Sequence, residues 1–344
     1  MVTKHRPRLG IALGSGAAKG WAHIGILNGL AKIGIKPDLI SGCSIGALVG
    51  AAHAGGNLGR LEQWVRGFTK LQVMSLLDPT FSGRGLFSGD KVFNVIANGM
   101  KQKDFSETKL PFGVVATDLN TGRELWMQDG DMISAVRASC AMPGIFVPIY
   151  RNDHLLIDGA VVNPVPVSLA RAMGADVVIA VNLAGEQHHK FNVEEEEEEE
   201  EGVIRQWLSR IRPERSVKDK DPALPSMWSV MSGAIDIMQE RITRARMAGD
   251  PPELELKPRV SDINIMEFYR AEEAIAEGEA CVERMSKFLL AELAYLGIHP
   301  QSPDAEDTEE EAVDDTPEQL DDLSDETLLD EANSELIDEP KNKD

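Results

Sequence analysis

One serine stands between two glycines at a point where the chain changes character. Residues 37–56 read PDLISGCSIGALVGAAHAGG, in which Gly42, Ser44 and Gly46 form a G-x-S-x-G pattern. The residues before it are typical of a short buried strand, and the small apolar residues after it are typical of a helix. In that context the pattern predicts a nucleophile elbow, whose glycines admit a strained turn and leave the serine hydroxyl exposed. A tight packing turn is the alternative.

A serine nucleophile needs a base, and none of the seven histidines stands in a persuasive position. The better candidate is Asp158 in HLLIDGA, a carboxylate at the end of an expected strand, followed by Gly159 and Ala160. Burial would raise the pKa of such a carboxyl and make it a stronger base. An ordinary turn aspartate is the alternative interpretation.

An earlier turn, in LGSGAAKGWAHIG, is also rich in glycine. Free N–H groups at the start of the helix that follows would attract negative charge. A Walker motif is excluded, because Lys19 is followed by Gly20 and not by Ser or Thr. Gly14, Gly16 and Gly20 approach a dinucleotide fingerprint, which keeps an NAD(P)-dependent oxidoreductase open as an alternative.

The net charge of −22 is concentrated in two segments. Residues 301–344 hold 19 acidic and 2 basic residues, and an unbroken run of glutamates spans Glu194 to Glu201. The rest of the chain is close to neutral and has no basic cluster that could follow phosphates, so we expect no nucleic-acid binding. Which protein the acidic tail would bind is left open.

Cysteine usage and hydropathy indicate the compartment. The three cysteines, Cys43, Cys140 and Cys281, are too scattered for a disulfide framework or a zinc site, which fits a reducing environment. No signal peptide or membrane-spanning helix is predicted. We therefore expect a cytoplasmic protein without metal or cofactor. Its contact with the inner face of the membrane should be transient at most, because acidic lipid would repel the tail.

Strand and helix patterns alternate along most of the chain and predict an α/β fold with a mainly parallel sheet. Five units are expected from changes in composition together with the family resemblance given in the next paragraph, which implies the catalytic domain. They are an N-terminal extension (1–8), a catalytic domain (9–186), an acidic flexible insertion (187–222), a helical and strand part that completes the domain (223–299), and an acidic disordered tail (300–344).

Several ordered segments carry a family resemblance. GIALGSGAAKGWAHIGIL, SGCSIGALVGAA, ATDLNTG, RASCAMPGIFVP and DGAVVNPVPV, in this order, resemble the patatin-like lipid acyl hydrolases, and more narrowly the bacterial relatives of neuropathy target esterase. The resemblance covers about residues 9–186, and LKPRVSDINIMEFYRAEEAIAEG is similar to the C-terminal part of that subgroup. It implies a three-layer patatin-type fold, in which helices flank a mainly parallel central sheet.

The resemblance also implies roles for individual residues. Ser44 matches the nucleophile of the family, and Asp158 in its D-G-A turn matches the catalytic aspartate, which gives a dyad that needs no histidine. The function implied is a serine esterase that cleaves lipid acyl esters, such as phospholipids or lysophospholipids, through an acyl-enzyme. A regulatory or scaffold protein of the same fold, with weak catalysis, is the alternative from another class.

The glycine-rich oxyanion loop of the family, G-G-G-x-R/K-G, matches residues 15–20. The chain keeps Gly16, Lys19 and Gly20 but has Ser15 and Ala17 where the family has glycines. The resemblance implies that the oxyanion is held by the backbone N–H groups of Gly16, Ala17 and Ala18. Because backbone groups do this work, the two replacements need not abolish the oxyanion hole.

Overall fold

The structure is a computed structural model that describes residues 6–80, 84–184 and 227–301 of the 344-residue chain. The chain divides into two units, residues 1–300 and 301–344, and all described elements belong to the first. The acidic insertion expected at 187–222 lies outside the described residues, as does the expected acidic tail from residue 302 onward.

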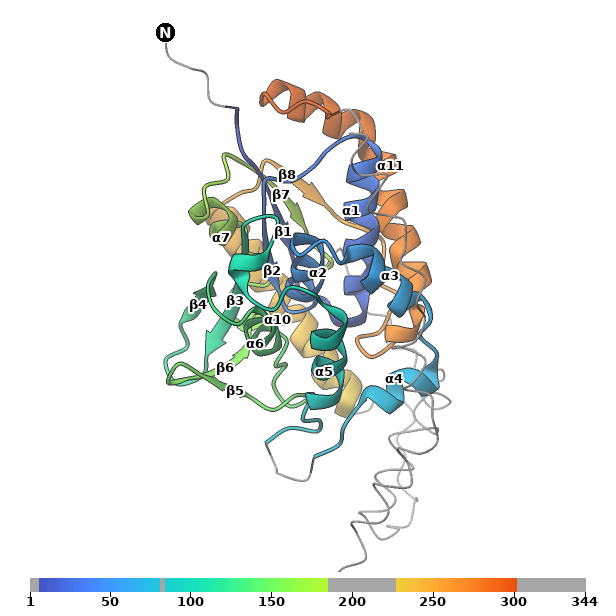
Figure 1. Cartoon of the computed structure of the whole chain (residues 1–344), viewed down its shortest axis with the longest axis vertical. Coiled ribbons are helices and arrows are strands. Elements are labelled where there is room, and N and C mark those ends of the chain that lie inside the picture. Colours follow the sequence, from blue (N-terminus) through green and yellow to red (C-terminus); the bar gives the residue numbers. More distant parts are fainter. Residues whose placement is uncertain (1–5, 81–83, 185–226, 302–344) are drawn as a thin grey trace, which may run out of the picture. The chain divides into compact units, whose positions relative to one another are not determined.

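A single sheet of eight strands forms the centre of the first unit (Figure 1). Its order is β5-β6-β3-β2-β1-β7-β8, and β4 also pairs with β3. The strands are β1 (Leu9–Leu13), β2 (Leu39–Cys43), β3 (Phe112–Asp118), β4 (Glu124–Met127), β5 (Ile149–Arg151), β6 (His154–Asp158), β7 (Val177–Val181) and β8 (Leu254–Leu256). The strands from β3 through β2, β1 and β7 to β8 run parallel, whereas β4, β5 and β6 pair antiparallel.

The helices connect and cover these strands. The α-helices are α1 (Ala22–Lys32), α2 (Ile45–Ala54), α3 (Leu58–Arg66), α4 (Lys70–Leu76), α5 (Asp90–Gly99), α6 (Met132–Ser139), α7 (Val167–Ala172), α10 (Met227–Gly249) and α11 (Ala271–Tyr295). Short 3-10 turns are η1 (Ala17–Trp21), η2 (Phe105–Glu107), η3 (Gly159–Val161) and η4 (Phe268–Arg270). Residues 58–76 form two helices, α3 and α4, because Thr69 caps a new start at α4.

Both faces of the parallel strands are buried, which makes three layers. Along β1, Leu9, Ile11 and Leu13 belong to the larger core, which contains α1, α2 and α11, while Ala12 belongs to a smaller core under α7. Helices α1 and α11 pack side by side on the face of the sheet that carries the larger core (Figure 1). Continuous burial of every β1, β2 and β7 residue is what a parallel sheet covered on two sides requires. The predicted α/β fold with a mainly parallel sheet is confirmed.

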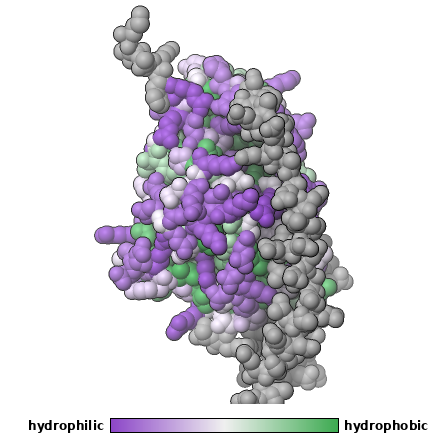
Figure 2. Space-filling view, viewed as in Figure 1, coloured by the Kyte–Doolittle hydropathy of each residue, from purple (hydrophilic) through white to green (hydrophobic). Residues whose placement is uncertain are grey.

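On the face seen in Figure 2, hydrophilic side chains predominate and apolar residues form small patches between them. Within residues 6–80, 84–184 and 227–301, no helix combines the length and the apolar character needed to cross a bilayer.

Candidate active site

Ser44 occupies the sharp turn between β2 and α2. Its backbone has φ 55° and ψ −125°, a region that side chains other than glycine rarely adopt. A Cβ on Gly46 would lie 2.3 Å from the carbonyl oxygen of Leu13, and one on Gly42 would lie 2.6 Å from the carbonyl oxygen of Gly46. Both neighbours of the turn must therefore be glycine, and the strand–turn–helix geometry is that of a nucleophile elbow.

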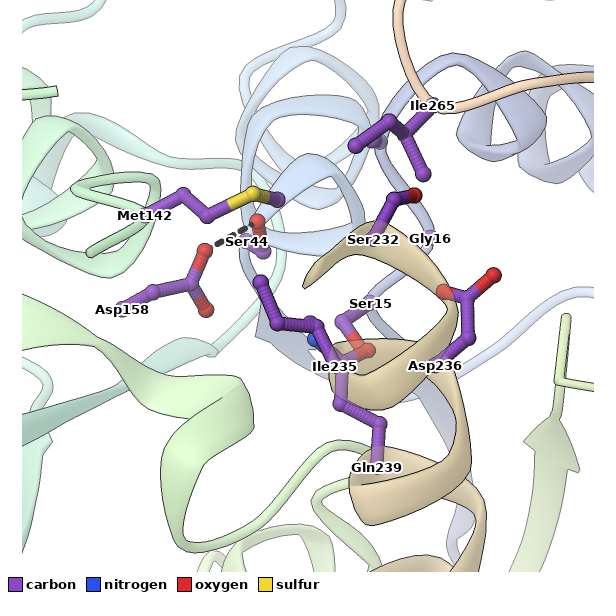
Figure 3. Close-up of a pocket in the computed structure, with 11 residues that line it drawn as sticks. Ser15, Gly16, Ser44, Met142, Asp158, Ser232, Ile235, Asp236, Gln239 and Ile265 are labelled. Carbon is purple, nitrogen blue, oxygen red and sulfur yellow. Dashed lines mark hydrogen bonds between the residues drawn. The ribbon is translucent and has the colours of Figure 1, made fainter. Parts of the chain in front are cut away.

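The sheet brings Asp158 to the serine across the chain. Strand β3 lies between β2 and β6, and its Val115 pairs with Cys43 while its Ala116 pairs with Asp158. Strand β2 runs parallel to β3 and β6 runs antiparallel to it, so the last residues of β2 and β6 approach each other from opposite directions. They pair with adjacent residues of β3. The hydroxyl of Ser44 donates a 2.7 Å hydrogen bond to Oδ2 of Asp158 (Figure 3).

The Asp158 carboxylate is held in a dry environment. The residue is 2% exposed, and burial raises the pKa of its carboxyl to about 6, against the lowering effect of the Ala160 N–H and Ser44 hydroxyl. The N–H of Ala160 donates to Oδ1 at 2.8 Å, just after Gly159 at the start of η3. One oxygen is thus fixed by the backbone, while the other accepts the hydrogen bond from the Ser44 hydroxyl.

A second serine supports the elbow from behind. Ser139, at the end of α6, is fully buried; its hydroxyl accepts the N–H of Ser44 at 2.8 Å and donates to the Val115 carbonyl at 2.6 Å. The next segment is tied to β6, because the N–H of Asp158 donates to the Ala141 carbonyl at 2.9 Å. The RASCAMPG segment therefore bridges the two halves of the dyad.

The glycine-rich loop passes beside Ser44 and begins η1. Ala17 has φ 49°, a left-handed conformation in which glycine would be less strained. Among the described residues, no hydrogen bond to the N–H of Gly16 or Ala17 is present, as expected for the first turn of a helix. The N–H of Ala18 differs from the expectation, because it donates to the Ile265 carbonyl at 3.3 Å. Gly20 packs against Ile45 of the elbow helix.

His23 of α1 fixes the strand end that leads into this loop. Its Nε2 lies 2.7 Å from the Gly14 carbonyl oxygen, which can only accept, so Nε2 carries the proton. Burial lowers the pKa of His23 to about 4, so the ring is neutral near pH 7. No sequence pattern pointed to this role.

Comparison with known proteins shows the family to which the chain belongs. The sequence model described as "Patatin-like phospholipase" matches residues 11–171, which contain the elbow and Asp158. A protein of Mycobacterium tuberculosis named as an uncharacterized NTE family protein is 30% identical over 328 residues, covering 80% of this chain and 90% of that protein. The chain belongs to the patatin-like phospholipase family.

Mammalian proteins of the patatin-like phospholipase family match a shorter stretch. Patatin-like phospholipase domain-containing protein 7 of Mus musculus is 35% identical, covering 51% of this chain and 13% of that protein. The human patatin-like phospholipase domain-containing protein 6 is 31% identical, with coverage of 52% and 13%. A crystal structure of VipD from Legionella pneumophila, with a TM-score of 0.35 and 11% identity over 84% of this chain and 77% of that chain, is too weak a likeness to carry any feature over.

Helix α10 lies outside the part matched by the patatin-like family model, yet it contributes to the site. Ser232, Ile235, Asp236 and Gln239 line a cavity with the dyad and the glycine-rich loop (Figure 3). The Ser15 hydroxyl donates to Oε1 of Gln239 at 3.0 Å, and Nζ of Lys19 lies 3.3 Å from Oδ2 of Asp236. Ser15 and Lys19 of the loop are therefore both engaged by α10.

Two further cavity residues, Met142 and Ile265, had no sequence signal, because each lies in an irregular segment that only tertiary packing brings to the serine. His154, the histidine nearest to Asp158 in the sequence, lies at the other end of β6. Its Nδ1 lies 2.9 Å from Oδ2 of Asp118, the last residue of the neighbouring strand β3. The pair that is hydrogen-bonded at the cavity is thus Ser44 and Asp158, and His154 is not part of it.

Proposed function

We propose that the chain is a serine esterase that hydrolyses acyl esters of phospholipids, lysophospholipids or related lipids, with Ser44 as nucleophile and Asp158 as base. The observation that carries the proposal is the 2.7 Å hydrogen bond from the Ser44 hydroxyl to a buried carboxylate, made at a nucleophile elbow. Membership of the patatin-like phospholipase family supports the lipid ester as substrate class.

Acylation needs one proton to move twice. As Oγ of Ser44 bonds to the ester carbonyl carbon, Asp158 accepts the hydroxyl proton at Oδ2. When the tetrahedral intermediate collapses, Asp158 returns the proton to the departing alcohol oxygen, and Ser44 keeps the acyl group. A carboxyl with a pKa of about 6 is suited to both roles, since it is ionised at neutral pH and yet binds a proton more readily than an exposed aspartate.

The oxyanion requires donors that are already in place. The N–H groups of Gly16 and Ala17 open η1 beside Ser44, where they would stabilise the negative oxygen. The N–H of Ala18 would join them only if it left the Ile265 carbonyl. Deacylation repeats the cycle, with water in place of the serine hydroxyl and Asp158 accepting the proton of the water.

Fluorophosphonate labelling and ester hydrolysis test the proposal. With phospholipid vesicles present, wild type should label at Ser44 and cleave a short-chain p-nitrophenyl ester and a lysophospholipid. Ser44→Ala should do neither, and Asp158→Asn should lose at least about 10³-fold in kcat because the base is gone. Activity retained in both variants would show that Ser44 and Asp158 are not the catalytic dyad. A wild type that neither labels nor cleaves would favour the scaffold alternative, and fluorescence of bound NADPH would revive the oxidoreductase alternative.

A further inference from the structure

The cavity over Ser44 is too small for the proposed substrate. Its volume is about 10 Å³, which is the space of about one water molecule. Pockets that hold a lipid-sized ligand have volumes of roughly 300–1,000 Å³. An ester with its acyl chain therefore cannot reach Ser44 while the lining residues stay where they are. Four of those residues belong to α10.

Helix α10 has its polar side turned inward at this point. Ser232, Ile235, Asp236 and Gln239 follow the spacing of one helical face and line the cavity, and three of the four are polar. The opposite face is apolar: Val230 is 52% exposed, Met231 40%, Ile237 47% and Met238 56%. A helix that served only to cover a core would turn its apolar residues inward and its polar residues toward solvent.

The half of α10 over the site is held by polar contacts to the glycine-rich loop. These are the Ser15–Gln239 hydrogen bond and the Lys19–Asp236 ion pair, in which the Lys19 side chain is only 5% exposed. The other half is anchored to the body. Arg246 pairs with Glu124, and Asp250, just past the helix, pairs with Arg171 at 2.9 Å.

The outer face of α10 combines exposed apolar residues with a positively charged arginine. Val230, Ala234 and Ile237 form an exposed stripe that continues to Arg241, one turn beyond the apolar part. An amphipathic helix with apolar residues beside arginine is the type that lies at a lipid–water interface, where its guanidinium meets lipid phosphate. The stripe and the residues that line the cavity at Ser44 lie on different faces of the same helix.

We propose that the 230–241 half of α10 is a cover over Ser44 that a phospholipid surface displaces by binding its apolar outer face. Displacement opens the cavity and releases Ser15 and Lys19 of the loop from Gln239 and Asp236. This inference rests on the proposed esterase function for its purpose. The surface contact and the movement of the helix can be measured without catalysis.

The surface contact is tested by flotation with vesicles of phosphatidylcholine alone and of phosphatidylcholine mixed with phosphatidylglycerol. The double variant Ile237→Ser, Met238→Ser should float at least about tenfold less than wild type. The matched control, Phe288→Ser with Tyr295→Ser on α11, removes exposed aromatic residues of 53% and 86% exposure elsewhere and should float as wild type does. Equal flotation of both double variants would overturn the proposed surface.

The movement is tested by thiol accessibility, read at the single site by mass spectrometry. In Ile235→Cys the new thiol faces the cavity and leaves Gln239 and Asp236 in place, so maleimide should react slowly in water and at least about tenfold faster with vesicles. Ala248→Cys, on the exposed anchored half, should react equally in both. An Ile235→Cys rate that vesicles leave unchanged would overturn the cover.

The polar contacts are tested with Asp236→Asn combined with Gln239→Ala. Loss of about two such bonds should raise the rate of fluorophosphonate labelling in water by about tenfold or more. If no variant labels at all while Ile235→Cys responds to vesicles, the cover stands and the esterase function fails. If wild type labels well and neither this variant nor vesicles change its rate, the esterase function stands and the cover fails.

Discussion

The hydroxyl of Ser44 is hydrogen-bonded to a carboxylate, Asp158, that is 114 residues away in sequence and almost entirely withdrawn from water. Burial favours the protonated form of Asp158, whereas the bonds from Ala160 and Ser44 favour the ionised form, and burial dominates. The same carboxyl therefore links the pH dependence of activity to that of stability.

Activity should follow the ionisation of Asp158. Since the base must be ionised to accept the Ser44 proton, kcat/KM should rise with pH through about 6 and level off above it. Below that point the rate should fall about tenfold per pH unit. The measurement is the pH profile of labelling or ester cleavage between about pH 5 and 8, with circular dichroism showing that the fold persists. A flat profile over this range would mean that Asp158 is not the base.

Asp158 should reduce the free energy of unfolding at neutral pH. Its folded-state pKa of about 6 lies above the ordinary value of 3.8, so the stability present at low pH is lost as pH rises through the folded-state pKa. Relative to wild type, Asp158→Asn should gain about 2 kcal/mol of stability between about pH 4.5 and 7.5. Denaturant titrations of both proteins at the two pH values measure this change in the stability difference. Hydrogen bonds that the substitution removes equally at both pH values do not contribute to it. A constant difference would show that the pKa is not raised.

Removal of the Ser139 hydroxyl should change the reactivity of Ser44 through the backbone of the turn. Ser139→Ala leaves the buried N–H of Ser44 and the Val115 carbonyl without this partner, at a cost of about 1–3 kcal/mol in stability. The strained turn then loosens, so kcat should fall more than KM rises. Ser286→Ala, which removes a hydroxyl that donates to the Glu283 carbonyl of its own helix, is the control and should change neither. An unchanged kcat in Ser139→Ala would show that the turn at Ser44 keeps its conformation without this hydrogen bond.

The elbow should tolerate no side chain at Gly46. In Gly46→Ala the new Cβ would sit 2.3 Å from the Leu13 carbonyl, so β1 and α2 must separate, and both labelling and thermal stability should drop. Gly59→Ala is the matched control, since nothing lies within 4 Å of the Cβ it would add in α3. That variant should gain up to about 1 kcal/mol from helix propensity. Equal behaviour of the two variants in thermal unfolding would contradict the close packing.

The sequence by itself determined the local elements of the site. The pattern around Ser44 predicts strand, turn and helix because glycines on both sides of a hydroxyl suit a turn whose backbone passes close to its neighbours. Asp158 was a candidate because it ends an apolar strand and precedes Gly159. The alternation of strands and helices predicted the α/β class. Each strand, turn and helix in these inferences depends on residues a few positions apart, and the α/β class follows from their order along the chain.

Tertiary structure decided the contacts between distant segments, of which the family resemblance had implied only the pairing of Ser44 with Asp158. The register of β3 with β2 and β6 places Asp158 against Ser44, and the resulting burial sets the pKa of the carboxyl. Ser139 and His23 acquire their partners only when α6 and α1 pack on the sheet. The side of α10 that faces Ser44 was equally undetermined, because helical spacing defines two faces of a helix and only packing selects which of them turns inward.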